Sequence, residues 1–534
     1  MSRGFAGRRE ELAELATGVA SADRGVGRTF LVNGEPGIGK TRFCEEVATR
    51  ASSDGARVLW GRCWEGAGAP VYWPWIQIMR PLLRSPDRDR LLGAVEPERA
   101  YLEQILPEVA RNNIGVNVEV VESDRGRFYV FDAVATLLAT ASEERTLVLI
   151  LDDLHHADRP TLMLLDFIAA NLRDARVVTL GTYRPADVQL DPDRGHILAS
   201  AARRSRVIPL SGLTPSEVTE LIDATEGIDL PSETISALVA LSEGNPFFLD
   251  EFVRLVVSEG TDLSDIAVPH GVREIIRQRV RPLSVATRQL LDIAAVIGRE
   301  STLAVLERVA DLPRDSTRDG LWAAERSGII DEAGLAPGVY RFVHALIRET
   351  LYEDLPPSER AQIHLRVARA LEDLYPHDVD QRVIEIAHHY FRALEGGIGE
   401  AASRAIEHLT AAGGSSMERF AWEEAAHHFG EALTALDLAS DDPSARIELL
   451  LKRGEALKRG ADLKGSLDAF AAAAEVARAL DDPGPSLARA AIGFEDARWA
   501  DINLWRMPEA IMLLREALGS LGPDDKASRS AVLA

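Results

Sequence analysis

The chain has 534 residues, which is too long for one hydrophobic core, so we expect roughly three or four domains. Its 84 acidic residues outnumber its 60 basic ones, and the formal net charge of −24 argues against nonspecific binding of the whole chain to nucleic acid. Two cysteines make no disulfide framework, the N-terminus has no signal-peptide pattern, and no apolar run reaches the ~18 residues of a membrane span, so we expect a cytoplasmic protein with no membrane partner.

Residues 1–210 alternate short apolar runs with amphipathic segments, which is typical of a parallel α/β sheet. Helices are expected between the strands, notably over residues 125–141 and 159–172. Trp73 and Trp75 lie among apolar residues, which predicts that they belong to the local core and not to a base-stacking surface. The predicted strands cover residues 28–33, 57–62, 146–153, 176–183 and 206–210.

The strand pattern then stops, and helical patterns take over. Start signals at Thr214, Pro231 and Asn245 predict three short helices, which would form a lid domain over residues 211–265. Residues 266–376 combine several helices with a small hairpin in the stretch GIIDEAGLAPGVYRFVH, which is the pattern of a winged-helix domain.

Residues 377–534 consist of Ala-rich amphipathic helices, in which three similar segments recur every 41 to 44 residues or so. This spacing exceeds that of a tetratricopeptide unit but suits helical-hairpin repeats. No polar capping repeat follows the last segment, so we expect TPR-like repeats truncated from a longer protein. The similar segments are residues 421–433, 463–480 and 506–518.

The stretch GEPGIGKT, between a predicted strand and a predicted helix, matches the phosphate-binding pattern G-x-x-x-x-G-K-[ST]. Its glycines let backbone N–H groups wrap a phosphate, and the following helix points the positive end of its dipole at the same place. Lys40 is the only lysine before Lys452. Lysine is needed at this position because a compact ammonium must reach the β- and γ-phosphates, and the larger guanidinium does not replace it. The expected nucleotide-binding residues of this loop are Gly34, Pro36, Gly37, Ile38, Gly39, Lys40, Thr41 and Arg42.

A P-loop also needs a carboxylate at the end of a neighbouring buried strand, and the stretch LVLILDD supplies Asp152 and Asp153. We expect Thr41 and Asp152 to hold Mg²⁺, and Asp153 to orient or deprotonate the attacking water. His155 and His156 follow closely, but no further Cys or His spacing completes a ligand set, so we predict no second metal site there.

The strand over residues 176–183 is expected to insert between the P-loop strand and the strand that carries the two acids, as in the additional-strand class of P-loop ATPases. Arg184 at its end would then lie near the γ-phosphate and report whether that phosphate is present. The predicted catalytic residues are Lys40, Asp152, Asp153 and Arg184.

Together these motifs resemble the STAND class of signal-transduction ATPases and are most similar to the large ATP-binding LuxR-family (LAL-type) transcriptional regulators. The stretch FAGRREELAEL resembles the opening box of that group, which implies that Gly7 and Arg8 cup the adenine and ribose. The stretch LDDLHHADRPTLMLLDFIA is similar to its extended Walker B motif, with His156 where a Trp is more usual.

Two later motifs extend the resemblance, which covers roughly residues 4–375. SEGNPFFLDEFVR resembles the lid motif whose proline packs on the adenine, and Pro246 is the matching residue. YRFVHALIRETLYEDL is similar to the winged-helix motif that ends in His-Asp in apoptotic and plant-resistance relatives, where the His contacts the β-phosphate of ADP. His344 matches that His, but Ala345 replaces the Asp, so any role of that Asp is absent.

The resemblance implies an α/β P-loop (AAA-like, additional-strand) ATPase domain followed by an all-α lid, a winged helix and TPR-like repeats. ADP would hold a closed monomer, and an unknown inducer or protein partner on the repeats would favour opening, ATP exchange and homo-oligomerisation. Hydrolysis of ATP to ADP and phosphate would be slow. Transcription regulation would require a DNA-binding helix-turn-helix, which is not found before Ala534, so DNA contact is expected only through a C-terminal domain outside this chain.

Three alternatives stay open. One is a defence-type sensor of the same class with a different effector, and another is an origin-recognition-like ATPase that binds DNA through its winged helix. A P-loop kinase for a small molecule is least favoured, because the repeats would have no role in it. The candidate recognition helix carries arginines offset by acids, and a stronger basic stripe elsewhere is expected to face solvent. These arginines are Arg314, Arg318 and Arg326 in the first case, and Arg273, Arg277 and Arg281 in the second.

Overall fold

A computed structural model of the chain divides into two compact units. One comprises Met1–Gly66 with Tyr72–Leu355, and the other comprises Ala67–Val71 with Pro356–Ala534. The structure describes residues 5–64, 69–110, 126–189, 191–224, 230–259, 272–332, 338–376, 379–439, 442–499, 506–522 and 525–533.

The first unit is built on a five-stranded parallel sheet, and every predicted strand is confirmed to within one residue at either end. The strand order is β2-β3-β4-β1-β5, so β4 lies between β1 and β3, as the additional-strand class requires. Because all five strands are parallel, their carboxyl ends meet at one edge of the sheet. The strands are β1 (Arg28–Asn33), β2 (Arg57–Arg62), β3 (Leu147–Asp152), β4 (Val177–Tyr183) and β5 (Arg206–Pro209).

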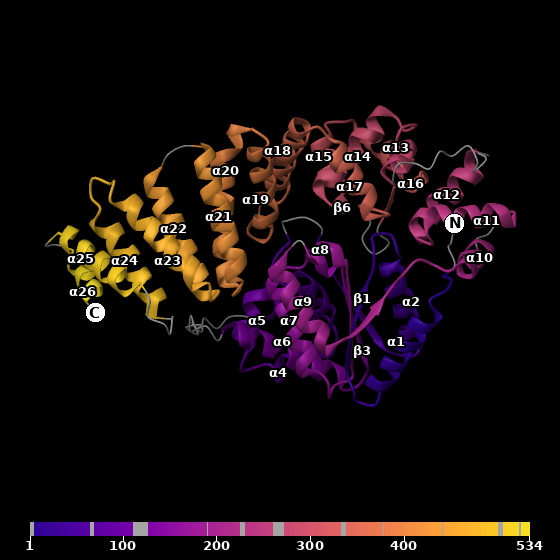
Figure 1. The fold of residues 1–534 in the computed structure, drawn as a ribbon, viewed down its shortest axis with the longest axis horizontal. Helices are drawn as coiled ribbons and strands as arrows, with labels where there is room; N and C mark the ends of the chain where they lie inside the picture. Colours follow the sequence, from indigo (N-terminus) through magenta and orange to yellow (C-terminus); the bar gives the residue numbers. More distant parts are fainter. Residues whose placement is uncertain are drawn as a thin grey trace. The chain divides into compact units, whose positions relative to one another are not determined.

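Helices cover both faces of this sheet (Figure 1). The apolar stripes of α1 (Arg9–Ala22) and α2 (Lys40–Ser53) pack on one face, in a core that contains Phe30, Ile150 and Leu180. The opposite face is covered by α6 (Gly126–Ser142), α7 (Arg159–Asn171) and α9 (Pro192–Arg204). The central strand β3 is buried along its whole length, as its unbroken apolar run predicts.

The connection between β2 and β3 adds helices beside the sheet. Trp75 is fully buried, and its indole N–H donates to the carbonyl of Thr161 at 3.1 Å, so the prediction that it belongs to the core is confirmed. The further helices are α3 (Trp73–Leu83), α4 (Arg88–Ala94), α5 (Arg99–Ile105) and, between β4 and α9, α8 (Pro185–Gln189).

Three helices after the sheet share a small core of their own, and the three start signals are confirmed. Thr214 caps the first helix in a capping box with Glu217, Pro231 precedes the second, and the third begins directly after Asn245. The helices are α10 (Pro215–Asp223), α11 (Ser232–Ser242) and α12 (Pro246–Glu259), and their shared core includes Val218, Leu238 and Phe252.

The rest of the first unit surrounds a three-stranded antiparallel sheet of order β6-β8-β7. The predicted hairpin is confirmed as β7 and β8, while residues 333–337 of it lie outside the described residues. The sequence does not predict β6, because three residues are too few to show an alternating pattern. The elements are α13 (Val272–Val280), α14 (Val285–Ile297), β6 (Glu300–Thr302), α15 (Leu303–Ala310), α16 (Arg314–Arg326), β7 (Ile330–Glu332), β8 (Val339–Phe342) and α17 (Ala345–Asp354).

The second unit is a row of helices in which successive helices lie side by side (Figure 1). Its main part begins at Pro356, so the first helix after Pro356 groups with the repeat helices, although the sequence places residues up to 376 with the preceding domain. The helices are α18 (Pro357–Leu374), α19 (Val379–Glu395), α20 (Ala402–Glu418), α21 (Trp422–Ala439), α22 (Pro443–Arg459), α23 (Leu463–Ala477), α24 (Gly484–Trp499), α25 (Met507–Ser520) and α26 (Lys526–Leu533).

The three similar segments fall on α21, α23 and α25, each of which is the second helix of a hairpin, so helical-hairpin repeats are confirmed. Glycines let the helices approach closely. A Cβ on Gly413 would lie 2.4 Å from the Phe429 ring, and one on Gly454 would lie 2.8 Å from the Phe470 ring. Within the described part of the chain, no helix is both long and apolar enough to cross a bilayer.

Candidate functional site

The P-loop lies where β1 ends and α2 begins. Gly37 and Gly39 have φ values of 82° and 95°, in the left-handed region that side chains disfavour, so the loop needs glycine at both places. A Cβ on Gly37 would also lie 2.8 Å from the side chain of Asn245, which approaches from the start of α12. The glycines therefore allow both the shape of the loop and its close contact with Asn245, just before α12.

Lys40 is folded into this loop. Its ammonium Nζ donates to the carbonyls of Gly34 at 2.8 Å and Glu35 at 2.9 Å. Burial lowers the pKa of Lys40 to about 8, and the nearby charge of Arg184 lowers it further than burial alone would. Because Lys40 and Arg184 repel each other, an anionic ligand bound between them would be electrostatically favoured.

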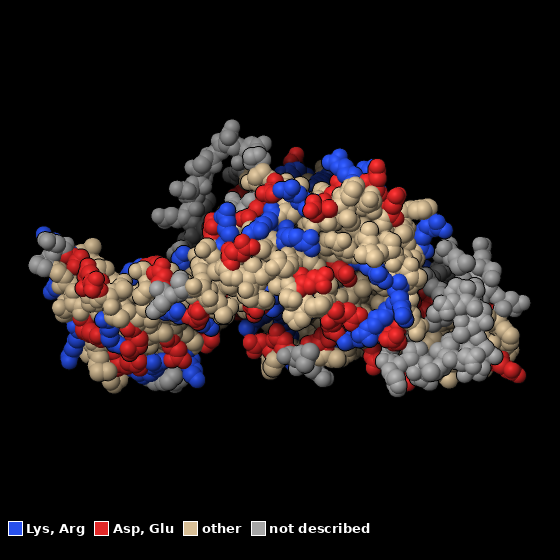
Figure 2. Space-filling view, turned by 90° about the horizontal axis from the view of Figure 1, so that it is seen from above, with Lys and Arg blue, Asp and Glu red and all other residues tan. Residues whose placement is uncertain are grey.

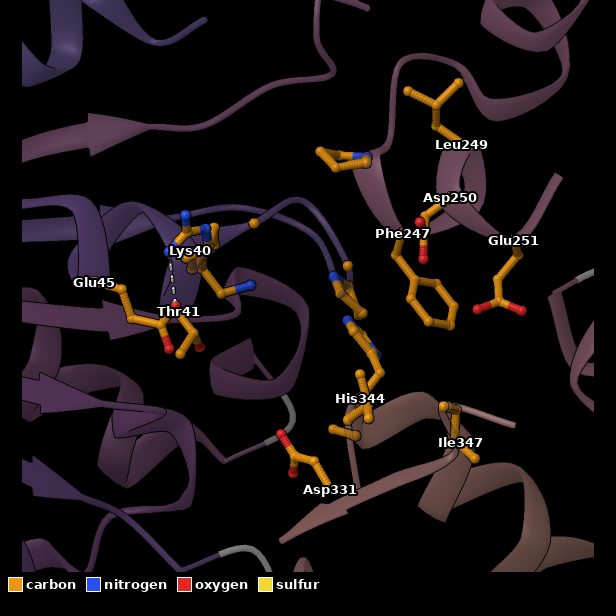
Figure 3. Close-up of a pocket in the computed structure, with 18 of the residues that line it drawn as sticks. Lys40, Thr41, Glu45, Phe247, Leu249, Asp250, Glu251, Asp331, His344 and Ile347 are labelled. Carbon is orange, nitrogen blue, oxygen red and sulfur yellow. Dashed lines mark hydrogen bonds and ion pairs between the residues drawn. The ribbon is translucent and has the colours of Figure 1, made fainter. Parts of the chain in front are cut away.

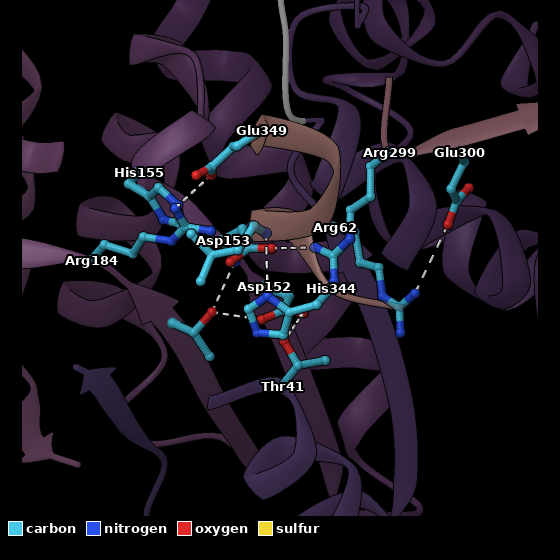
Figure 4. A network of polar contacts seen from close by, with 12 residues as sticks. Thr41, Arg62, Asp152, Asp153, His155, Arg184, Arg299, Glu300, His344 and Glu349 are labelled. Carbon is cyan, nitrogen blue, oxygen red and sulfur yellow. Dashed lines mark hydrogen bonds and ion pairs between the residues drawn. The ribbon is translucent and has the colours of Figure 1, made fainter. Parts of the chain in front are cut away.

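Asp152 and Thr41 meet beneath the loop (Figure 4). Asp152 is fully buried at the end of β3, and its carboxylate accepts from the Thr41 hydroxyl at 3.0 Å and from the Thr182 hydroxyl at 2.6 Å. Burial, together with the charge of Asp153, raises the pKa of Asp152. Hydroxyl and carboxylate oxygens are the donors that Mg²⁺ prefers, so the two residues predicted to hold the ion are in contact and fit it.

Asp153 adopts the left-handed conformation, with φ of 61°, which turns its carboxylate away from β3. Its N–H donates to Thr182 Oγ1 at 2.8 Å, and its carboxylate lies 2.5 Å from the guanidinium of Arg299, just before β6. Burial alone would raise the pKa of Asp153, but Arg299 and other nearby cations outweigh burial and lower it. Asp153 is therefore an anion held by a residue from far along the chain.

Arg184, at the end of β4, has a comparable partner. Its Nη1 lies 3.0 Å from a carboxylate oxygen of Glu349, in the middle of α17. A third and looser pair joins Arg62, the last residue of β2, to Glu300, the first residue of β6, at 4.0 Å. All three pairs join strand ends of the parallel sheet to the segment that carries β6 and α17 (Figure 4).

The start of α12 is fastened to the P-loop. The side-chain amide of Asn245 donates to the carbonyl of Pro36 at 3.0 Å, and the N–H of Phe247 donates to the carbonyl of Gly37 at 3.3 Å. Pro246, between them, lies close to Gly39. Pro246, which is predicted to pack on the adenine, is thereby held beside the phosphate loop.

His344 caps the N-terminus of α17. Its Nδ1 accepts the N–H of Leu346 at 3.2 Å, so in the neutral ring the proton is on Nε2. Burial, and then the charge of Arg299, lower the pKa of His344 to about 3. The ring stacks on that of Phe247, with centroids 4.0 Å apart and planes inclined at 30°. His344 is thus a neutral side chain that links the start of α17 to Phe247 at the start of α12.

These groups surround one cavity of about 410 Å³ (Figure 3), which is within the range of small-molecule sites. The sheet side of its wall carries Lys40, Thr41 and Asp153, and the opposite side carries Phe247 and His344. Further wall residues that the sequence singles out are Pro36, Gly37, Gly39, Arg42, Arg184 and Pro246.

Gly7 and Arg8 are placed elsewhere and do not line this cavity. The guanidinium of Arg8 donates to the carbonyls of Ser211 and Ile38, and its N–H donates to Glu217 at 2.9 Å. Arg8 therefore braces the P-loop against α10 in this conformation. The role of Gly7 and Arg8 toward adenine and ribose stays a prediction.

The predicted basic stripe lies on α13, and two of its three arginines are paired. Arg273 forms an ion pair with Glu353, and Arg277 forms a two-pronged pair with Asp354 at 2.7 and 2.8 Å, so solvent is not their only neighbour. Figure 2 shows acidic and basic side chains interspersed on the face that it presents. This arrangement leaves the stripe with little net charge for a phosphate backbone.

The sequence does not single out Asn245, Phe247, Arg299, Glu300 or Glu349 as site residues. Asn245 and Phe247 flank Pro246, so the motif itself could have drawn attention to them. Arg299, Glu300 and Glu349 carry no local signal, because their partners are far away in the sequence; 146 positions separate Arg299 from Asp153.

A family model described as an AAA ATPase domain matches residues 4–180, which include the P-loop and both acids of β3. An uncharacterized protein of Rhizobium meliloti (strain 1021) is 24% identical over 453 residues. The match covers 80% of this chain and 42% of that protein, so the chain spans less than half the length of the curated relative it matches.

Two solved structures are similar in fold. One is a signal transduction ATPase with numerous domains (STAND) and a tetratricopeptide repeat sensor from Pyrococcus horikoshii, at 16% identity and a TM-score of 0.43, with 100% of this chain and 73% of that chain covered. The other is a Walker-type ATPase of Pyrococcus abyssi, at 14% identity and a TM-score of 0.32, with 65% and 96% covered.

Proposed function

We propose that this chain is an ATP- and ADP-controlled switch of the STAND class, in which slow hydrolysis of ATP to ADP resets the switch. The observation that carries the proposal is a cavity whose wall combines the P-loop, the start of α12 and the start of α17. A nucleotide in this cavity would touch three segments at once. Its phosphates would therefore influence how those segments are held together.

In this proposal the P-loop amides and Lys40 bind the β- and γ-phosphates, and Lys40 leaves the carbonyls of Gly34 and Glu35 to do so. Thr41 and Asp152 would hold Mg²⁺, and the ion would supply positive charge next to the phosphates. Asp153 orients the attacking water, and Arg184 senses the γ-phosphate. The ion pairs that engage Asp153 and Arg184 support slow turnover.

On the opposite wall, Pro246 packs on the base and the Nε2–H of neutral His344 donates to the β-phosphate of ADP. The neutral state of His344 supports this role, because a neutral ring with Nδ1 engaged offers one N–H donor and keeps it across physiological pH. Gly7 and Arg8 would reach the adenine and ribose only after the braces to Ser211 and Glu217 have rearranged.

The proposed domains are the ATPase core (1–210), the lid (211–265), the winged helix (266–376) and TPR-like repeats (377–534). An inducer or protein partner on the repeats would favour opening, ATP exchange and homo-oligomerisation. To move such an equilibrium from 1:99 to 99:1, the ligands must bind the open state better by about 5.5 kcal/mol. As output we propose transcription regulation of the LuxR-family type, with DNA contact through a domain outside this chain.

Lys40→Ala tests the nucleotide site, and Lys452→Ala on α22 is the matched control because it removes the same side chain from the second unit. Isothermal titration with Mg-ATP and Mg-ADP should give binding to the wild type and to the control variant. Lys40→Ala should lose at least about 100-fold in affinity, because an ammonium that meets the phosphates in a largely buried site is removed. Equal affinity of all three proteins would refute the site.

A further inference from the structure

Three ion pairs join the carboxyl edge of the parallel sheet to the segment from Arg299, just before β6, to α17. Along the strand order β2-β3-β4, the charge of the sheet partner alternates. Asp153 of the sheet edge receives Arg299, whereas Arg62 and Arg184 of the sheet edge receive Glu300 and Glu349. Two of the three sheet partners, Asp153 and Arg184, are the residues to which the proposed function assigns water orientation and γ-phosphate sensing.

These two pairs are also the better buried ones. The side chains of Arg299 and Asp153 are 18% and 13% exposed, and that of Arg184 is 9% exposed. Glu349 is 30% exposed, and the Arg62–Glu300 pair is longer, with no side chain as buried as Arg184, Arg299 or Asp153. Burial reduces screening by salt and water, so the Arg299–Asp153 and Arg184–Glu349 pairs are the ones expected to govern whether this segment stays docked.

Arg299 is held in place by the backbone around it. Its carbonyl accepts the N–H of Phe342 at 3.1 Å, so it extends the sheet that β8 forms with β6. The preceding residue, Gly298, has a φ of 144° and passes the indole ring of Trp64 so closely that a Cβ would lie 3.4 Å from it. The guanidinium is therefore presented to Asp153 from the residue just before β6, whose backbone is held by β8.

We propose that Arg299 and Glu349 are positioning residues that withhold Asp153 and Arg184 from the nucleotide while the segment from β6 to α17 is docked. This inference rests on the proposed function. A carboxylate that pairs with a guanidinium is stabilised as the anion and is therefore a weaker base toward a water proton. A guanidinium directed at Glu349 is likewise drawn toward α17 and away from a γ-phosphate. Release of the segment removes both pairs in one step, and Arg184 then keeps only the longer contact with Asp187 of α8, at 3.6 Å, among these carboxylates.

Nearby arginines have other partners. Arg277 of α13 pairs with Asp354, and Arg341 of β8 pairs with Asp331, so neither of these pairs reaches the sheet edge. Arg299 instead reaches the sheet, and it meets the acid that follows the Mg²⁺ ligand. Arg277 is thus an internal reference, since it makes the same kind of ion pair, to the same helix α17, without touching the ATPase core.

The first experiment measures single-turnover hydrolysis at saturating Mg-ATP for Arg299→Gln, Glu349→Gln and the double variant, with Arg277→Gln as control. We expect the rate constant to rise at least about tenfold in the double variant, with the affinity for ATP changed by less than about threefold. Arg299→Lys keeps the charge, and its rate should stay near that of the wild type. Arg277→Gln should leave the rate unchanged.

The second experiment needs no nucleotide. Cys44 and Cys63 are buried, so fluorescent labels can be directed to new cysteines at Ser53 on α2 and Asp319 on α16, both exposed. The distance distribution between the labels in the full chain should shift to longer values in the double variant and stay unchanged in Arg277→Gln. Melting temperatures, measured in parallel, identify any variant that fails to fold. If the double variant does not fold, Glu349→Gln, which removes one pair, is compared with Arg299→Lys, which keeps the charge.

Each remaining outcome overturns the inference. A fall in the rate of Arg299→Gln at unchanged ATP affinity would make Arg299 a residue that hydrolysis needs. Equal increases for Arg299→Gln and Arg299→Lys would show that the charge pair is not the cause. An unchanged rate and an unchanged distance in the double variant, which still binds ATP, would reject the withholding role and leave the proposed function intact. Failure of the proposed function would appear instead as ATP affinity that does not depend on Lys40.

Discussion

The two walls of the cavity are built from different kinds of contact. On the sheet side, Asp152 at the end of β3 accepts hydrogen bonds from Thr182 of β4 and from Thr41 of α2. On the opposite side, the segments after the sheet approach through Arg–carboxylate pairs and through the stacked rings of Phe247 and His344. The strands that carry Asp152 and Thr182 separate only when the sheet unfolds, whereas ion pairs and ring stacks at a segment boundary can separate while both sides stay folded.

This difference indicates a division of work. The sheet side is preformed and would hold a nucleotide, and the opposite side can be released and would respond to which nucleotide is held. Substitutions on the sheet side should therefore abolish binding or hydrolysis. Substitutions on the opposite side should change the rate of release by smaller factors and leave the core able to bind.

The largest effect after Lys40→Ala is expected at Asp152. Asp152→Asn keeps the shape but removes the charge that is proposed to hold Mg²⁺, so hydrolysis should fall by at least about 100-fold. Binding of ATP in the presence of EDTA should change by less than about threefold. The comparison of affinities with and without Mg²⁺ makes the test specific, and a variant that hydrolyses ATP at the wild-type rate would contradict the assignment.

A smaller effect is expected at Asn245. Asn245 is buried, and its side-chain amide donates a hydrogen bond to the carbonyl of Pro36. Asn245→Ala leaves that carbonyl unpaired and should weaken ADP binding about tenfold, which corresponds to about 1.4 kcal/mol. Ser236→Ala on the exposed face of α11 is the control and should bind ADP normally. Dissociation rates from a fluorescent ADP analogue provide the measurement. If both variants behave alike, the start of α12 does not belong to the site.

At His344 the expected change is smaller again. His344→Ala removes a stacked ring and the donor proposed for ADP, so ADP should dissociate roughly three- to fivefold faster. Loss of this contact should also increase the oligomer fraction seen by light scattering without inducer. A variant that stays an ADP-bound monomer with unchanged dissociation would remove His344 from the switch.

The smallest effect concerns pH. The pKa of His344 is lowered to about 3 in the folded chain, against about 6.5 when unfolded, so below pH 6.5 the unfolded state takes up a proton that the folded state refuses. The stability contributed by the neutral ring is present above pH 6.5 and is lost as pH falls toward 3. Between pH 7.5 and 6 this one group should lower the free energy of unfolding by about 0.8 kcal/mol. His344→Asn should lose less stability over that range, as measured by thermal unfolding.

Much of the sheet side could be predicted from the sequence because its signals are local. The five strands appear as apolar runs, the glycines of the P-loop mark its shape, and Asp152 and Asp153 follow an unbroken apolar strand. The position of β4 between β1 and β3 came from the class of P-loop fold that these motifs define, and the register of the sheet agrees with it.

The opposite side could be predicted only in part. Pro246 and His344 were found because motifs surround them, but Arg299 and Glu349 stand in no pattern of their own. Their meaning depends on where β6 and α17 dock, and a three-residue strand leaves no periodic signal. The unexpected place of Arg8 has a similar cause, because its partners Ser211 and Glu217 lie some two hundred positions away.

The central claim is that one nucleotide contacts both walls at once, and hydrogen–deuterium exchange of the full chain with and without ADP tests it most directly. ADP should slow amide exchange in the P-loop at residues 34–41, and equally at the starts of α12 and α17 around Phe247 and Leu346. Lys40→Ala should show none of these changes. Protection confined to residues 34–41 would contradict the claim, because a nucleotide that leaves the opposite wall untouched cannot control it.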